Sequence, residues 1–133
     1  MSTDGLISVR SSFAAQDTHA RLENAIKARG LTVFARIDHA QGAADAGLTL
    51  RPTLLVLFGN ARGGTPLMQA AQTTGIDLPL KALVWEDITH LTWLSYNDPQ
   101  WIAARHGVAG AVAGPLKALS GALAAIAAEA TSG

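Results

Sequence analysis

Cysteine is absent from this chain of 133 residues. Its absence excludes disulfide bonds, a thiolate nucleophile and cysteine-ligated zinc, and it leaves the redox compartment undetermined. Charge is scarce too, because charged residues make up only 15% of the chain and ten basic residues balance ten acidic ones. A chain without a net positive field is not expected to bind nucleic acid or an anionic membrane.

The sequence also lacks a long, strongly hydrophobic span. Residues 108–128 come closest, with Lys117 as their only charge. Most of this stretch is alanine and glycine, and Pro115 suits the start of a helix better than the centre of a bilayer. Large apolar residues recur at helical spacing over 116–126, so we expect an alanine-rich helix with one apolar stripe. The N-terminus has neither the basic start nor the apolar run of a signal peptide, so a cytoplasmic location is expected.

What is present fits one domain. A chain of this length with 49% hydrophobic residues can bury a single substantial core. No internal repeat, linker or low-complexity segment marks a boundary, and residues 1–133 are therefore predicted to form a single domain.

The first half of the chain alternates between strand and helix patterns. A strand is predicted at residues 6–13, and a helix at 16–29 that Asp17 or Thr18 caps and Gly30 ends. Further predictions are a strand at 31–38, a short helical turn within 39–47, and a continuous apolar run at 53–58 that is typical of a strand buried on both faces.

The second half continues this alternation. A helix is expected to begin with Thr65 as its N-cap and Pro66 as its first residue, and to end at Gly75. The later patterns predict, in order, a hairpin (82–86 with 91–96), a short helix (98–107) and the alanine-rich helix.

The resulting order is strand-helix-strand-strand-helix-strand-strand-helix. It favours an α+β fold in which helices pack on one face of a mostly antiparallel sheet. A doubly wound α/β fold is the runner-up, disfavoured because only a short turn separates the last two strands.

The glycine-rich turn at residues 59–65 is the candidate binding site. It follows a predicted buried strand and leads into a helix, whose first N–H groups and dipole favour an anion. Arg62 can add a bidentate contact to a phosphate or carboxylate, although the turn lacks the lysine of a P-loop. The alternative is a tight strand-to-helix connection that binds nothing. The predicted ligand-binding residues are Gly59, Asn60, Arg62, Gly63, Gly64 and Thr65.

Asp38, His39 and Glu86 are the candidates for acid–base chemistry. A histidine beside a carboxylate can act as a general base, but neighbours on a strand point to opposite faces. Asp38 is equally suited to capping the helical turn that follows it. Glu86 and Asp87 form a pair of acids at the hairpin, where exposed turn acids are common. The four histidines lack the spacing of metal ligands, and neither a metal nor a cofactor is predicted.

Six motifs follow one another in the order of a known family: Arg36-Ile37-Asp38-His39, residues 50–60, Gly64-Thr65, residues 77–80, Trp85-Glu86-Asp87 and Tyr96-Asn97-Asp98. Over roughly residues 33–107 the chain resembles the domain of unknown function 302 family. The resemblance implies a small α+β domain, often found as a homodimer, and it implies no reaction. Two positions depart from the family pattern. Ala61 stands where proline is common, and residues 88–90 replace a hairpin glycine.

Two functions of different classes follow. The favoured one is a non-enzymatic homodimeric module that binds a small anionic ligand at the glycine-rich turn. The alternative is a small acid–base enzyme, a hydrolase or isomerase, that uses His39 with Asp38 or Glu86. Convergence of these side chains with Arg62 on one pocket would favour the enzyme, and a purely structural role would leave the turn empty. A dimer contact is expected at Trp93, Trp101 or the apolar stripe at residues 116–126.

Overall fold

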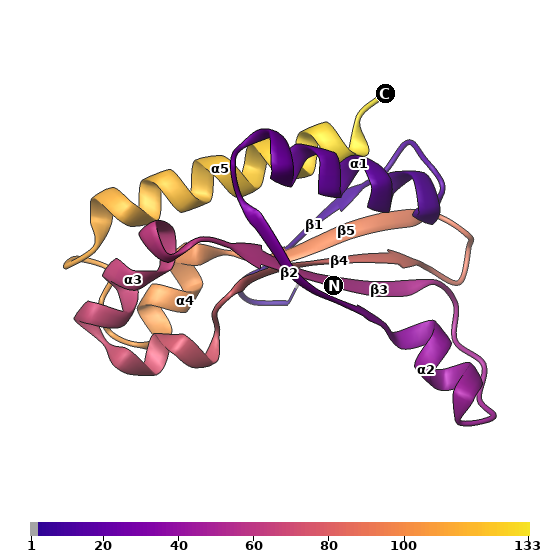
Figure 1. Ribbon diagram of the computed structural model, residues 1–133, viewed down its shortest axis with the longest axis horizontal. Coiled ribbons are helices and arrows are strands. Elements are labelled where there is room, and N and C mark those ends of the chain that lie inside the picture. Colours follow the sequence, from indigo (N-terminus) through magenta and orange to yellow (C-terminus); the bar gives the residue numbers. More distant parts are fainter. Residues whose placement is uncertain (1–2) are drawn as a thin grey trace.

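A five-stranded sheet organises the computed structural model, which describes residues 3–133 (Figure 1). The strand order is β1-β5-β4-β3-β2, and every neighbouring pair runs antiparallel. This arrangement confirms the predicted α+β fold and excludes the doubly wound alternative, which requires parallel neighbours. The strands are β1 (Leu6–Arg10), β2 (Thr32–Asp38), β3 (Thr53–Gly59), β4 (Leu80–Glu86) and β5 (Thr92–Asn97). The helices are α1 (Ala15–Ala28), α2 (His39–Asp45), α3 (Ala61–Ala70), the 3-10 helix η1 (Gln72–Ile76), α4 (Pro99–Arg105) and α5 (Ala113–Thr131).

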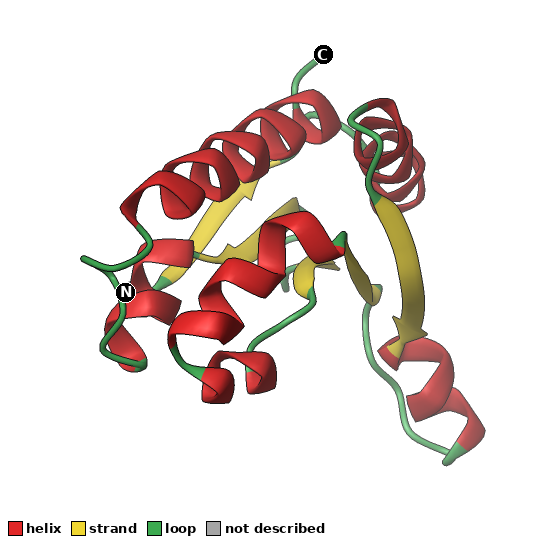
Figure 2. Ribbon diagram, turned by 60° about the vertical axis from the view of Figure 1, so that its left-hand side comes forward, coloured by secondary structure: helices red, strands yellow, loops and turns green. Residues whose placement is uncertain are grey.

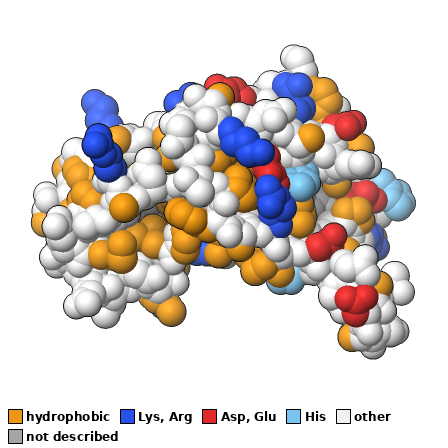
Figure 3. All heavy atoms as spheres, in the orientation of Figure 1, with side chains coloured by type: hydrophobic (Ala, Val, Ile, Leu, Met, Phe, Trp, Pro, Cys, Tyr) orange, Lys and Arg blue, Asp and Glu red, His pale blue; other side chains and the backbone are white. Residues whose placement is uncertain are grey.

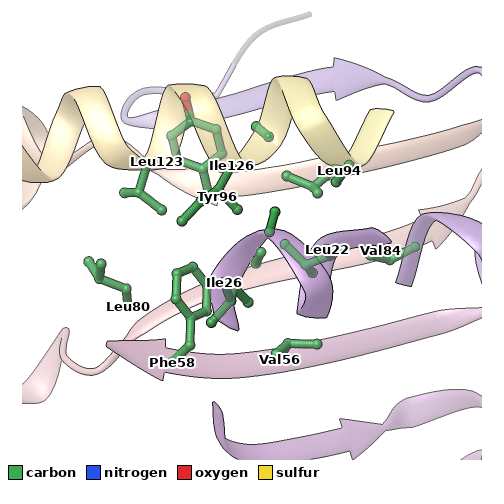
Figure 4. Close-up of a cluster of buried hydrophobic side chains, with 14 residues drawn as sticks. Leu22, Ile26, Val56, Phe58, Leu80, Val84, Leu94, Tyr96, Leu123 and Ile126 are labelled. Carbon is green, nitrogen blue, oxygen red and sulfur yellow. The ribbon is translucent and has the colours of Figure 1, made fainter. Parts of the chain in front are cut away.

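Helices α1 and α5 lie side by side on one face of the sheet (Figures 1 and 2). Their helical periodicity turns Leu22 and Ile26 of α1, and Leu123 and Ile126 of α5, toward the strands (Figure 4). Fully burying one such side chain stabilises the fold by about 1.5–3 kcal/mol. The strands supply the opposite side of this core with Val56, Phe58, Val84 and Leu94.

The start of α1 differs from the prediction. Neither Asp17 nor Thr18 caps the helix, because the N-cap position is Ala14, whose side chain accepts no hydrogen bond. Thr18 lies one turn inside the helix, where its buried hydroxyl is 2.6 Å from that of Ser11. The predicted end is confirmed, since Gly30 takes a φ of +72°, which glycine adopts without strain.

The apolar stripe of α5 lies in the core, which corrects one of the expected dimer contacts. Leu116, Leu123 and Ile126 are each only 1–2% exposed. Trp101 also has a partner within the chain, because its indole packs over Gly5. A Cβ atom added to Gly5 would lie 2.2 Å from Cγ of Trp101, and Gly5 has a φ of +76°. The fold of one chain therefore explains the stripe of α5, whereas Trp101 remains 37% exposed.

Strand β3 is buried on one face rather than on both. Val56 and Phe58 point to the helices and are fully buried, whereas Leu55 and Leu57 point away and are only half-buried. Within residues 3–133, the helices that pack against the sheet lie on the opposite side from these two leucines. The apolar run at residues 53–58 thus contains more hydrophobic surface than one copy of the chain covers.

A charged cluster that the sequence did not indicate fastens α1 to β2. Glu23 is 8% exposed and accepts hydrogen bonds from Nε and Nη2 of Arg36, both at 2.5 Å. His19, one turn earlier on α1, also contacts this carboxylate. The pKa of Glu23 is lowered from 4.5 to about 2, chiefly by the hydrogen bonds from Arg36. Such a buried carboxylate is stabilised only while its partner remains in place.

Candidate functional site

The glycine-rich turn connects the end of β3 to the start of α3. Gly59 is buried and has a φ of +148°, a conformation that other residues rarely adopt. Asn60 is the N-cap of α3, and its Oδ1 accepts a hydrogen bond from the N–H of Gly63 at 2.8 Å. The helix therefore begins at Ala61, which corrects the prediction that Thr65 is the cap and Pro66 the first residue.

The sequence contained a signal for the correct start. Asparagine is a stronger N-cap than threonine, which favours Asn60. The prediction of Thr65 relied instead on the preference of proline for the first helical position, which Pro66 would have occupied. Pro66 instead lies inside α3, where it costs one backbone hydrogen bond. Ala61 occupies the first helical position, which explains why the resembled family commonly has proline there.

Gly63 and Gly64 are helical residues. They matter because they lack a side chain next to close neighbours, and neither has an unusual φ. A Cβ on Gly63 would lie 3.1 Å from Cδ2 of Leu119 on α5, and one on Gly64 would lie 3.4 Å from Cδ1 of Leu78. Glycine at position 63 lets α3 approach α5 closely, and glycine at position 64 leaves room for Leu78. Among the glycines of the turn, only Gly59 has a positive φ.

The helix start opens onto a cavity of about 600 Å³ between α3, α5 and the ends of β2 and β3. Most of its lining is apolar, and Figure 3 shows hydrophobic side chains gathered between α5 and α3. Its volume lies in the range of sites that hold small molecules. The apolar lining includes Phe34, Phe58, Met68, Leu119, Leu123 and Ile126.

Polar groups border this cavity only at the helix start. Arg62 is exposed and, within residues 3–133, takes part in no hydrogen bond or ion pair of its side chain. The cap satisfies the N–H of Gly63, whereas those of Ala61 and Arg62 have no partner within the helix. The site therefore combines an apolar interior with a cation and free N–H groups at one side.

Phe34 is one of the apolar lining residues that the sequence did not indicate. The register between β2 and β3 shifts between Val33 and Ala35, so a β-bulge interrupts the alternation of side chains. Phe34 consequently lines the cavity while remaining 54% exposed. A bulge leaves no mark in a hydrophobic pattern, and nothing in the sequence signals this position.

The three acid–base candidates do not meet Arg62. The carboxylate of Asp38 caps α2 by accepting from the N–H of Gln41 at 2.9 Å, and His39 is the exposed first residue of that helix. Glu86 is bonded to His90, with 2.8 Å between Oε1 and Nδ1. These residues lie toward the start of β3, whereas Arg62 follows its end. A strand of seven residues separates the two ends by about 20 Å.

A second polar cluster ties η1 to α4. Nε2 of His106 is 2.7 Å from Oδ2 of Asp77, and its Nδ1 is 2.8 Å from the hydroxyl of Thr73. Nη1 of Arg105 contacts both oxygens of the same carboxylate, at 2.9 and 3.0 Å. These bonds hold η1 against the end of α4. In residues 3–133 no three His, Asp or Glu side chains are grouped so as to hold a metal ion.

Comparisons with known proteins concern the whole fold. A family model described as "Domain of unknown function DUF302" matches residues 7–126. The crystal structure of an uncharacterized conserved protein DUF302 from Bacillus stearothermophilus superposes with a TM-score of 0.85 at 19% sequence identity. The match covers 96% of this chain and 99% of that one, and at this identity it establishes the shared fold alone.

Two curated relatives from Brucella are 47% identical over 104 residues. Both are named "Fluoride-specific ion channel FluC 1", one from Brucella suis biovar 1 (strain 1330) and one from Brucella abortus biovar 1 (strain 9-941). The match covers 78% of this chain but only 41% and 38% of the two relatives, so the chain spans about two fifths of their length. Among the helices described here, none has both the length and the hydropathy needed to cross a bilayer.

Proposed function

Because the chain belongs to the DUF302 family, whose name assigns no activity, we propose its function from its own geometry: a non-enzymatic module that binds a small anionic ligand with an apolar body. The carrying observation is the apolar cavity of about 600 Å³ that opens beside Arg62 and the start of α3. In this proposal the apolar body occupies the cavity, and the anionic group contacts Arg62 and the first N–H groups of the helix.

The apolar body is expected to dominate the affinity. Each buried methylene contributes about 0.8 kcal/mol, so a chain of six contributes roughly 5 kcal/mol before the costs of association. One hydrogen bond to a charged group contributes about 1.5–3 kcal/mol, and an exposed arginine belongs at the lower end. A ligand with only a charge, such as phosphate, therefore binds more weakly than one with a hydrocarbon body.

The acid–base enzyme is the weaker alternative. It requires His39 to act with Asp38 or Glu86, but the carboxylate of Asp38 caps α2 and that of Glu86 is engaged by His90. None of the three candidates lines the cavity.

We further propose, from the family resemblance, that the module is a homodimer. We also propose that the protein is cytoplasmic.

A fluorescent dye with an apolar body and one sulfonate, anilinonaphthalene sulfonate, tests the ligand proposal. We expect its fluorescence to rise on titration into the wild-type protein and octanoate to displace it more strongly than octanol does. Arg62→Ala should weaken dye binding by about tenfold, which corresponds to 1.4 kcal/mol. Ala122→Trp should abolish binding, because Ala122 lines the cavity and the indole would fill it.

Matched controls separate the site from general effects. Arg51→Ala removes an exposed arginine in the segment between α2 and β3, far from the cavity, and should leave dye affinity unchanged. His39→Ala and Glu86→Gln should also bind as the wild type does. Equal affinity in the wild type and in a folded Ala122→Trp variant would contradict binding in this cavity. Equal affinity in Arg62→Ala would remove the arginine from the site.

The names of the Brucella relatives favour a second candidate function, an accessory domain of a fluoride channel. The matched segment makes up only part of those proteins, and we propose that it accompanies the pore rather than forming it. Fluoride-dependent behaviour of this chain is the direct test. If sodium fluoride raises the midpoint of thermal unfolding more than sodium chloride does at equal ionic strength, the candidate gains support. Equal midpoints in the two salts would count against it.

A further inference from the structure

The face of the sheet opposite α1 and α5 is apolar and uncovered by the described residues. Side chains alternate along each strand, so those that do not enter the core project from this outer face. The register confirms their proximity, because Leu55 pairs with Leu83 and Trp85 pairs with Trp93. The outer-face residues are Leu6, Ile37, Leu55, Leu57, Leu83, Trp85 and Trp93, all of them half-buried or exposed.

The two tryptophans and Lys81 on the outer face have polar partners within the chain, whereas Arg10 and Asn97 lie at the border of this face. Nε1 of Trp85 donates to Oγ of Ser95 at 2.9 Å, and Nε1 of Trp93 donates to Oδ2 of Asp87 at 2.8 Å. The ammonium group of Lys81 donates to two backbone carbonyls just before β4, at 3.0 and 3.1 Å. The two indole N–H groups therefore need no acceptor from water, whereas the ammonium group of Lys81 keeps one further N–H. A dry contact on this face would therefore leave few buried polar groups unsatisfied.

The outer face is large enough for a specific interface. Five strands about 4.8 Å apart and about six residues long, at about 3.3 Å per residue, give a projected area of roughly 480 Å². Two such faces together bury roughly 1,000 Å² or more, which reaches the size of specific protein interfaces. A single exposed apolar patch on a monomer seldom exceeds a few hundred Å² without a function.

We propose that a second copy of this chain covers the outer face, sheet against sheet, around a two-fold axis near Leu83. Leu83 stands on β4, the central strand of the sheet, and it also lines a groove of about 300 Å³. The side chains around Leu83 are mostly apolar, and the charge beside it, Lys81, is hydrogen-bonded to backbone carbonyls of its own chain. Two-fold pairing is the commonest symmetry of soluble oligomers. Two sheets pack face to face about 10 Å apart, as in β-sandwiches.

The sequence of β3 supports this occupant independently. Its continuous apolar run is typical of a strand buried on both faces, and α1 and α5 cover only one of them. A second copy supplies the missing layer without any additional protein. This inference rests on the proposed homodimer and names its surface, and it is independent of the ligand proposed for the cavity.

Sedimentation velocity of the wild-type chain and two variants tests the surface. The wild type should sediment as a dimer at high micromolar concentration, and Leu83→Glu should be a monomer because it places a charge at the centre of the contact. Leu48→Glu makes the same kind of change at a residue that is 68% exposed in the segment after α2, and it should remain a dimer. Circular dichroism establishes that each variant is folded.

Thiol labelling provides a second measurement that does not depend on a disruptive charge. Since the chain contains no cysteine, Leu83→Cys introduces a single thiol at the proposed contact and Leu48→Cys a single thiol outside it. The first should react with a maleimide at least tenfold more slowly in the concentrated protein than after dilution into the monomer. The second should react equally fast at both concentrations.

Each other result points elsewhere. A wild-type chain that stays monomeric at high micromolar concentration would overturn both the homodimer and its surface, while dye binding in the cavity could still succeed. A monomer that binds neutral lipid vesicles through Leu83 would assign the outer face to a membrane instead. A dimer that persists in folded Leu83→Glu, with equal labelling of Leu83→Cys at both concentrations, would overturn the surface alone.

Discussion

Glu23 is expected to make the stability of the fold sensitive to acid. The guanidinium of Arg36 lowers the pKa of Glu23 from 4.5 in the unfolded chain to about 2 in the folded one. A carboxyl group whose folded pKa is depressed contributes stability that is fully present above pH 4.5 and is lost as the pH falls toward 2. Below that window the unfolded and the folded chain are both protonated, and the contribution has vanished.

The size of the effect follows from the difference between the two pKa values. At about 1.4 kcal/mol per pKa unit, a difference of 2.5 units corresponds to at most roughly 3.4 kcal/mol. The side chain of Arg36 is 50% exposed, so solvent screens the pair and reduces its contribution to about 1–2 kcal/mol. We therefore expect the free energy of unfolding of the wild type to fall by about 1–2 kcal/mol more between pH 5 and pH 2.5 than that of Glu23→Gln.

Urea denaturation at a series of pH values measures this difference. Glu129→Gln is the matched control, because Glu129 is exposed and its nearest cation, Arg29, lies 3.5 Å away. It should follow the wild-type pH dependence closely. If Glu23→Gln and the wild type lose stability in parallel as the pH falls, the hydrogen bonds from Arg36 do not hold the pKa of Glu23 down, and the reasoning fails.

Three further predictions concern local geometry. Asn60→Ala should lower the free energy of unfolding by about 1 kcal/mol through loss of the cap of α3, whereas Thr65→Ala should lower it clearly less. Chemical denaturation compares the two variants, and a larger loss in Thr65→Ala would favour a helix that starts at residue 66. His90→Gly should raise the midpoint of thermal unfolding, because His90 has a φ of +67°, a conformation that costs a residue with a Cβ about 1 kcal/mol. An unchanged or lower midpoint would show that the hydrogen bond between His90 and Glu86 contributes more than the strain costs. Gly5→Ala should destabilise the protein by about 2–4 kcal/mol through overpacking and strain, and by much less in a chain that also carries Trp101→Ala. A double-mutant cycle measures the two losses, and equal losses would contradict the contact between Gly5 and the indole.

The architecture could be predicted because local patterns dominate it. The period of 3.6 in α1 and α5 and the paired strand patterns of the hairpin specify which faces are apolar, and short connections leave few arrangements for five strands. The predicted start of α3 was wrong because two residues near it are both suited to the N-cap position. Asn60, which caps the helix, lies five positions before Thr65, which was expected to do so. Local signals of similar strength are decided by packing, which a sequence pattern does not contain.

The sequence singled out the glycine-rich turn and Arg62, and that these residues bind a ligand stays a prediction. Apart from Thr65, the predicted residues line the cavity, whose apolar interior was not expected. That interior depends on a bulge at Phe34 and on the distance between α3 and α5, which Gly63 allows to be short. Both are tertiary features that arise only when segments far apart in the sequence meet. The uncovered face of the sheet could not be predicted for a different reason. A strand buried within one chain and a strand buried in an interface have the same hydrophobic pattern.

The pairing of β1 with β5 constrains how this chain can fold. Ser8 and Ser95 are hydrogen-bonded across 87 positions of sequence, and the backbone N–H of Ser12 bonds to the carbonyl of Thr131 near the other end of the chain. The first strand therefore has no partner until nearly three quarters of the polypeptide has left the ribosome. Closing so long a loop is entropically costly, so the hairpin of β4 and β5 should form first and β1 should join it late. Until then, one edge of β5 carries unpaired backbone groups, and molecules caught at this stage are the ones most exposed to aggregation.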